Sequence, residues 1–173
     1  MTTYWRLPAR ELRDLAAAGE ATVTAIVESC LERTAAVNSA VNAVVDIMAA
    51  SARADAARLD EQRARGVPCG PLHGVPLTVK AEFDVAGSTS TAGVVAYRDR
   101  VPGLDSPAVA RLRGAGAIIV GRTNEPDLGM RMHTECDLYG ATLNPWDVGV
   151  TPGGSSGGDA VACLLYTSDA ADE

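Results

Sequence analysis

Two stretches of the sequence decide the fold: VPLTVK at residues 75–80, and SPAVARLRGAGAIIV at residues 106–120. The first is a short β-prone run that delivers a lysine at its end. The second opens with a helical pattern, in which Ser106 is placed to cap the helix and Pro107 to occupy its first position, and it closes with the apolar run 117–120. A strand, a helix and a second strand in this order predict an α/β fold with a partly parallel sheet.

The N-terminal third, residues 1–66, is expected to be helical and to pack rather than to catalyse. Glycines stop the first and third segments of helical periodicity, and Asp46 is placed to cap the third. The expected helices cover 8–18, 23–36 and 47–65, and their buried faces are expected to comprise Ile26, Val27, Cys30, Leu31, Thr34, Met48, Ala52, Ala56 and Leu59.

The composition indicates a folded protein without a nucleic-acid or membrane partner. The chain has 173 residues, of which 47% are apolar, and a net charge of −7. This apolar content excludes a disordered chain, and an acidic chain without a basic run offers phosphate groups no clustered cations. No apolar stretch reaches the length of a membrane span, and the first residues lack the basic start and apolar run of a secretory signal. We therefore expect a cytoplasmic protein; its oligomeric state stays open, with a homo-oligomer among the options.

Neither a metal nor a cofactor is expected. The four cysteines stand far apart without a C-x-x-C pair, which argues against a disulfide scaffold and against a zinc site. His133 and Cys136 are close in sequence, but two ligands do not make a metal site, and ordinary packing accounts for them. The glycines of GAGAIIVG, residues 114–121, close a helix and precede a strand, which is the reverse of the order that dinucleotide binding requires.

Lys80 is the only lysine in the sequence, and the other 14 of the 15 basic residues are arginine. A desolvated lysine amine can lose its proton and serve as a base, whereas a guanidinium group stays charged. The competing interpretation is that one lysine survives by chance in an arginine-rich composition. The position of Lys80 at the carboxyl end of a predicted strand favours the catalytic interpretation, because open α/β sheets carry their functional groups there.

The segment TPGGSSGG at residues 151–158 is compatible with a flexible linker, a phosphate loop or a catalytic turn. Apolar sequence on both sides argues against the linker, and no lysine follows the glycines as a phosphate loop requires. Ser156 matches the hydrolase pattern G-x-S-x-G, but no histidine follows it, so a Ser-His-Asp arrangement in that order is excluded. A serine that uses Lys80 as its base is still available.

Together, these segments resemble the amidase signature family. The similarity lies in several motifs that occur in order between residues 70 and 158: GPLHGVPLTVK, FDVAG, STAG, ARLRGAGAIIVGRTNEP, LYGATLNPWD and TPGGSSGG. The resemblance implies an α/β fold with a mixed, largely parallel central sheet flanked by helices. It also implies hydrolysis of a small-molecule carboxamide through a serine acyl-enzyme with a Ser-Ser-Lys triad. Carried over by position, it implies that Lys80 is the base and that Ser155 is a relay serine preceded by a cis peptide bond. It also implies that Ser156 has a supporting role and that Gly129 leaves room in the acyl pocket.

The sequence departs from the family pattern in several places. The attacking serine of the family would fall beyond Glu173, and from about Cys163 onward the sequence no longer resembles that of the family. We therefore expect an N-terminal fragment of an amidase, with the base and the relay but without the nucleophile, that is inactive alone. Its expected parts are a helical region at 1–66, an incomplete amidase core at 67–162 and a non-native tail at 163–173. Ala81, where the family usually has Asp, and Asp159 are milder departures.

Two alternatives stay open. One is the glutaminase subunit of a tRNA-dependent amidotransferase, which is part of the same family, although residues 123–128 look more like those of a general amidase. The other is a non-catalytic binding module on the same scaffold, against which the retention of Lys80 and Ser155 argues. The sequence beyond residue 162 of the source gene would separate these alternatives.

Overall fold

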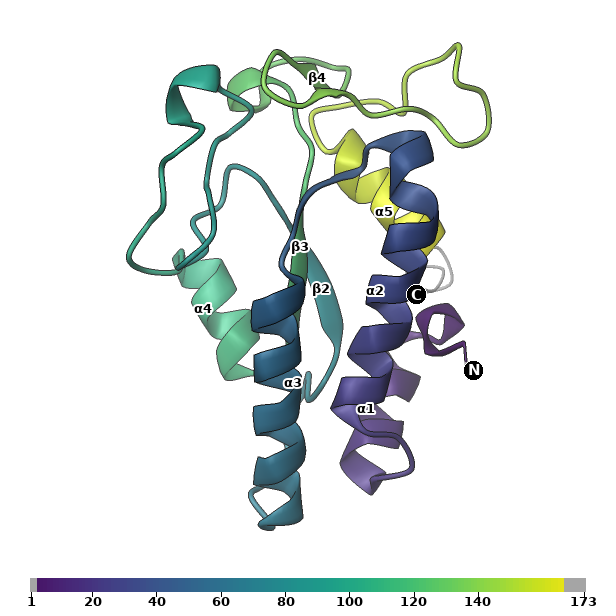
Figure 1. The fold of residues 1–173 in the computed structure, drawn as a ribbon, viewed down its shortest axis with the longest axis vertical. Helices are drawn as coiled ribbons and strands as arrows, with labels where there is room; N and C mark the ends of the chain where they lie inside the picture. The colour runs from purple at the N-terminus through teal and green to yellow at the C-terminus, as the bar shows by residue number, and fades with distance from the viewer. Residues whose placement is uncertain (1–2, 167–173) are drawn as a thin grey trace.

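A small mixed sheet forms the centre of the protein, whose computed structural model describes residues 3–166. In the sheet, β3 lies between β1, which is antiparallel to it, and β2, which is parallel to it. Figure 1 shows helices on both sides of this sheet. A second, antiparallel pair joins β4 to β5. The strands are β1 (Val44–Ile47), β2 (Pro76–Lys80), β3 (Ile118–Thr123), β4 (Glu135–Cys136) and β5 (Gly140–Ala141). The expected mixed α/β fold is confirmed.

The helices follow the expected order along the chain. The α-helices are α1 (Ala9–Ala18), α2 (Val23–Val41), α3 (Ala49–Ala64), α4 (Pro107–Gly114) and α5 (Gly157–Tyr166), and the 3₁₀ turns are η1 (Tyr4–Arg6), η2 (Val95–Tyr97) and η3 (Asp127–Gly129). Within residues 3–166, every helix falls short of the length or the apolarity that crossing a bilayer requires.

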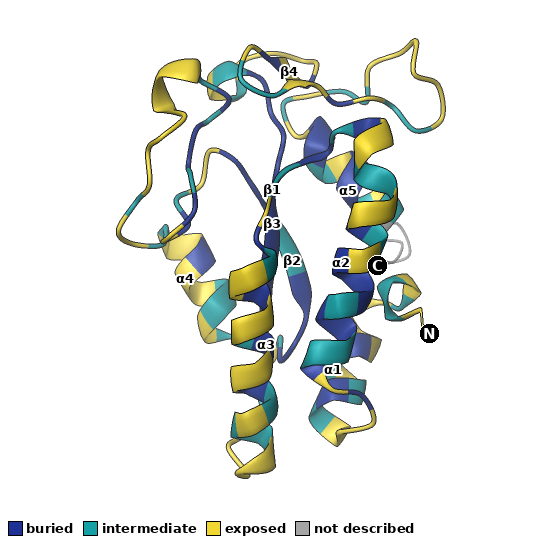
Figure 2. Ribbon diagram, in the orientation of Figure 1, coloured by how far each residue is buried: buried dark blue, intermediate teal, exposed yellow. Residues whose placement is uncertain are grey.

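β3 lies between two apolar layers because its successive side chains point to opposite faces of the sheet. Ile118 and Val120 pack against the cluster formed by α1, α2 and α3, whereas Ile119 packs with Val79 and with Val109 of α4 on the other face. All residues of β3 are buried, as Figure 2 shows by their dark colour. Burial on both faces explains why this strand is apolar at successive positions instead of alternating.

The predicted helices are present, but two of their boundaries differ by more than one residue. Every residue that was expected on a buried face of the first three helices is buried. α2 continues to Val41, and Asn42 ends it in a left-handed conformation. Residues 44–47 then form β1, so Ile47, the first residue of the expected third helix, lies in a strand, and α3 begins at Ala49.

The two predicted side-chain caps are wrong. Asp46 lies in β1, and its carboxylate accepts a hydrogen bond of 2.8 Å from Ser88 Oγ instead of capping α3. Pro107 does open α4, but the side chain of Ser106 makes no capping hydrogen bond. Pairing with β3 keeps the chain extended through Ile47, so a tertiary contact, rather than a local cap, sets the start of α3.

Arg122 of β3 is buried at the centre of the fold and organises the chain that follows β2. Only 1% of the Arg122 surface is exposed to solvent. Burial lowers the pKa of this guanidinium group, which nonetheless stays charged at neutral pH. The side chain donates hydrogen bonds to the carbonyl oxygens of Val79, Lys80, Ala81, Phe83 and Thr89. These bonds fix the turn after Lys80, because its buried carbonyl groups need donors.

Replacing Arg122 with methionine should lower the free energy of unfolding by about 3 kcal/mol or more, because several buried carbonyl groups would lose their donor. Urea unfolding measures this loss. Arg65→Met is the matched control, since Arg65 is exposed and pairs with Glu61 at the surface. Its effect should stay within about 0.5 kcal/mol. Equal losses in the two variants would contradict the organising role of Arg122.

Candidate active site

Lys80 and Ser155 meet at the carboxyl end of β2. The Lys80 side chain is 9% exposed, and its Nζ donates a hydrogen bond of 2.8 Å to Ser155 Oγ. Ser155 lies just before α5, and the peptide bond between Gly154 and Ser155 is cis. Strand β2 and the turn before α5 therefore each deliver one member of this hydrogen-bonded pair.

Close packing of glycines brings the turn before α5 to the strand ends. A Cβ atom on Gly158 would lie 2.4 Å from the carbonyl oxygen of Asn124, and one on Gly154 would lie 2.6 Å from the backbone nitrogen of His133. The Thr134 hydroxyl also holds the turn, because it donates to the Gly153 carbonyl group and accepts from the Gly157 backbone N–H. Larger residues at 154 and 158 would push Ser155 away from Lys80.

Ala81, at the position where the resemblance implies Asp, makes two backbone hydrogen bonds. The Ala81 backbone N–H donates to the carbonyl oxygen of Thr123 in β3. Its own carbonyl oxygen accepts from Arg122. The residue after the lysine is thus held through its backbone on both sides.

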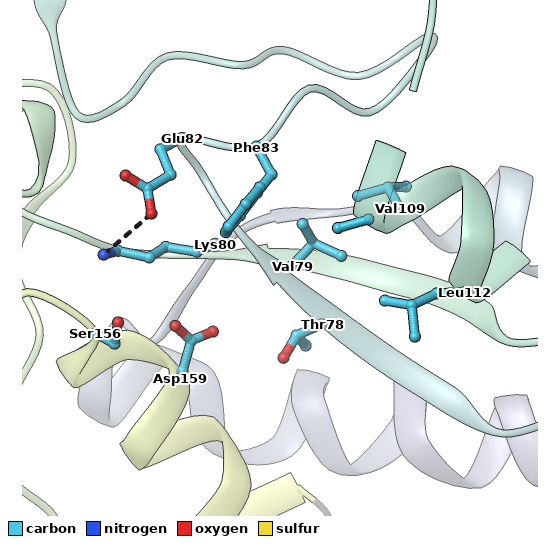
Figure 3. A pocket seen from close by; sticks show the side chains of 10 residues that line it. Thr78, Val79, Lys80, Glu82, Phe83, Val109, Leu112, Ser156 and Asp159 are labelled. Atoms are coloured by element: carbon cyan, nitrogen blue, oxygen red, sulfur yellow. Dashed lines mark ion pairs between the residues drawn. The ribbon is translucent and has the colours of Figure 1, made fainter. Parts of the chain in front are cut away.

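Three carboxyl groups surround the Lys80 amine. Glu82 Oε1 lies 3.4 Å and Glu125 Oε2 lies 3.7 Å from Lys80 Nζ. Asp159 of α5 lines the same cavity as Lys80, and its carboxylate accepts a short hydrogen bond from the Thr123 hydroxyl. Figure 3 shows Glu82 and Asp159 on opposite sides of the lysine. One amine group therefore faces three acidic side chains.

Burial changes the acidity of two of these groups. Burial and the neighbouring Glu82 raise the pKa of Glu125 to about 7, against an opposing effect of Lys80. Glu125 is fully buried, and within residues 3–166 neither of its carboxyl oxygens accepts a hydrogen bond. Burial also raises the pKa of Asp159, although the hydrogen bond from Thr123 opposes this effect.

A cavity of about 450 Å³ opens beside the amine. One end is apolar, with Val79, Phe83, Val109 and Leu112, and the other end carries Lys80, Glu82, Ser156 and Asp159 (Figure 3). The arrangement suits a ligand with an apolar part and a polar group that meets the lysine.

The four site residues predicted from the sequence, Lys80, Ser155, Ser156 and Gly129, lie at the Lys80 amine or line the cavity beside it. Ser156 is exposed and lines the cavity, while the hydrogen bond of Lys80 goes to Ser155. A Cβ atom on Gly129 would lie 3.6 Å from Lys80 Nζ, so this glycine borders the amine. Sequence reasoning did not assign Glu82, Glu125 or Asp159 to the site. The sequence feature that could have revealed Glu125 is the presence of an acidic residue shortly after the apolar run of a buried strand.

Replacing Glu125 with glutamine should stabilise the protein more at pH 8 than at pH 5. The pKa of Glu125 is about 7 in the folded state and near 4.5 when unfolded, so the folded state loses stability as pH rises through this interval. Glutamine removes that penalty, which is on the order of 3 kcal/mol above pH 7. Urea unfolding at the two pH values measures it, with the exposed Glu61→Gln as control. An identical stability difference at both pH values would contradict the buried titration.

Comparison with known proteins identifies the family. A family model described as amidase matches residues 25–166. An indoleacetamide hydrolase of Bradyrhizobium diazoefficiens is 42% identical over 165 residues, which are 94% of this chain and 32% of that protein. The A-type subunit of a glutamyl-tRNA(Gln) amidotransferase from Salinispora tropica is 39% identical over 96% of this chain and 34% of its own length. The chain thus spans about a third of the length of these curated relatives.

Comparison with solved structures points to the same family. A crystal structure of a bacterial aryl acylamidase of the amidase signature family superimposes with a TM-score of 0.88 at 30% identity, over 95% of this chain and 34% of that one. The match of the family model covers most of the sequence, and the sequence relatives and the structural neighbour agree with it. The chain belongs to the amidase signature family.

Proposed function

We propose that the protein hydrolyses the C–N bond of a small-molecule carboxamide through a serine acyl-enzyme, with a Ser-Ser-Lys triad. The observation that carries this proposal is the 2.8 Å hydrogen bond between Lys80 Nζ and Ser155 Oγ in a buried setting. The amide-hydrolysing relatives support the reaction class. The cavity beside Lys80 supports a substrate with an apolar part.

In the proposed mechanism, Lys80 acts as a neutral amine. It takes a proton from Ser155, which in turn takes one from the attacking serine as that oxygen adds to the amide carbonyl carbon. The tetrahedral intermediate collapses, the C–N bond breaks, and the leaving amine receives the proton that Lys80 holds, returned through Ser155. Water then hydrolyses the acyl ester. Ser156 supports this relay, and Gly129 leaves space beside the amine for the acyl group.

The attacking serine is proposed to lie downstream of residue 173 in the gene product. The amidase core would then comprise residues 67–162 together with that downstream part, behind the helical region 1–66. Helix α5 crosses the proposed boundary at residue 162, and residues 167–173 lie outside the described part of the chain. The non-native origin of residues 163–173 is still a prediction, which re-reading of the source gene tests.

A cytoplasmic location is part of the proposal. Cys30, Cys69 and Cys136 form no disulfide within the described residues, which suits a reducing compartment.

A second candidate function is that of a glutaminase subunit in a tRNA-dependent amidotransferase. The amidotransferase relatives favour it, since they match the chain nearly as well as the indoleacetamide hydrolase does. A glutaminase of this kind would release ammonia from glutamine faster in the presence of its partner chains, whereas a general amidase would act alone on aryl or alkyl amides.

Replacing Lys80 with arginine in the full-length gene product should lower kcat/KM for an aryl amide at least about a hundredfold. Arginine keeps the positive charge and can donate to Ser155, but it cannot release its proton at working pH. Ser155→Ala should cause a comparable loss. Steady-state kinetics over a panel of amides measures both.

Ser156→Ala serves as the comparison variant and should cost less than Ser155→Ala, because the hydrogen bond of Lys80 goes to Ser155. Full activity of Lys80→Arg would refute the role of Lys80 as a base. A wild-type protein that hydrolyses no amide of the panel, with or without partner chains, would refute the proposed function.

A further inference from the structure

Glu125 lies beside Lys80 at a position that the triad does not use. Its segment follows β3 and is held in place by its neighbour: the Asn124 backbone N–H donates to the carbonyl oxygen of Ala43, and the Asn124 side chain donates to that of Gly140. The backbone that carries Glu125 is therefore fixed against the start of β1 and against β5. This anchoring keeps its carboxyl group 3.7 Å from Lys80 Nζ.

The Glu125 carboxyl group has no hydrogen-bond donor of its own within residues 3–166, and it is fully buried. A buried carboxylate without donors is unfavourable unless a cation compensates its charge. Among the ion pairs of the described residues, the partner of Glu125 is Lys80. The charge of each group consequently depends on the charge of the other.

Besides Lys80, several charged or titratable side chains from neighbouring segments interact with Glu125. Within the described residues they are Glu82 after β2, Arg122 of β3, Cys136 of β4 and Asp159 of α5. Glu82 and Asp159 oppose ionisation of Glu125. Arg122 favours it, but its hydrogen bonds go to carbonyl oxygens of the chain after β2.

We propose that Glu125 is a positioning residue for Lys80, whose buried carboxyl group sets the pH at which the amine gives up its proton and becomes a base for Ser155. The proposal rests on the proposed amidase function. With Glu125 as a carboxylate, the ammonium form of Lys80 is favoured. With Glu125 neutral, that preference is lost, and the amine gives up its proton more easily. Glu82 has the lesser effect because water screens its side chain, which is 39% exposed.

The first test follows the Lys80 amine directly, by NMR titration of the chain labelled with ε-¹³C-lysine. Lys80 is the only lysine of the sequence, so it gives a single signal. We expect Glu125→Gln to move its titration to lower pH by about one unit or more, because a buried negative charge next to the amine is removed. Glu82→Gln, the control, should move it less. An unchanged titration in Glu125→Gln, or a larger change in Glu82→Gln, would overturn the proposal.

The reverse measurement keeps the proposal testable if Glu125→Gln does not fold. In the chain labelled with δ-¹³C-glutamate, Lys80→Met should move the titration of the Glu125 carboxyl group to higher pH, because coupling between two sites is reciprocal. An unchanged Glu125 titration in Lys80→Met would overturn the proposal independently.

The pH profile of the full-length enzyme connects this coupling to catalysis. In Glu125→Gln, the rising limb of kcat/KM against pH should move to lower pH by the same interval as the amine titration, while KM at the plateau stays within about twofold. A purely structural role would lower activity at every pH without moving the limb. If the NMR shift is present but the wild-type protein hydrolyses no amide, then the proposed function fails and the Lys80–Glu125 coupling stands.

Discussion

The buried guanidinium group of Arg122 is the interaction on which the rest of the structure depends. A charged group so deep in the protein needs acceptors, and the turn after β2 supplies them through its carbonyl oxygens. The turn is therefore held close to β3, and Lys80 is presented from a fixed strand end. The same side chain donates to Ser88, whose hydroxyl group donates to Asp46 of β1. One residue thus connects all three strands of the sheet to the candidate site.

Glycine provides the second constraint, since the Lys80–Ser155 hydrogen bond needs α5 close to the strand ends. Gly158, in the first turn of α5, approaches the backbone of residue 124 more closely than any side chain would allow, and Gly154, in the turn before α5, approaches that of residues 131–133 in the same way. Thr134 bridges this turn at two points. These backbone contacts therefore fix the position of Ser155, and they place its hydroxyl group within hydrogen-bond distance of the Lys80 amine.

Charge balance gives the site its chemical character. One amine faces several carboxyl groups, and a carboxylate next to an ammonium group would hold it protonated. Burial acts against this, because it disfavours the charged forms of Glu125 and Asp159. The charge of these carboxyl groups therefore depends on how deeply they are buried as well as on their distance from Lys80. This dependence is the reason why an acidic surrounding is compatible with the proposed role of Lys80 as a base.

The sequence by itself determined the strand–helix–strand core, the buried faces of the first three helices, and the lysine and serines of the site. These features depend on local periodicity and on residue chemistry, which the sequence displays directly. Only the tertiary structure decided that residues 44–47 form a strand, because that segment is extended through pairing with β3, which lies far along the chain. It also decided the burial and the partners of Arg122, Glu125 and Asp159. A charged residue next to an apolar strand looks the same in sequence whether water or protein surrounds it, and the burial and partners that set its behaviour come from distant segments of the chain.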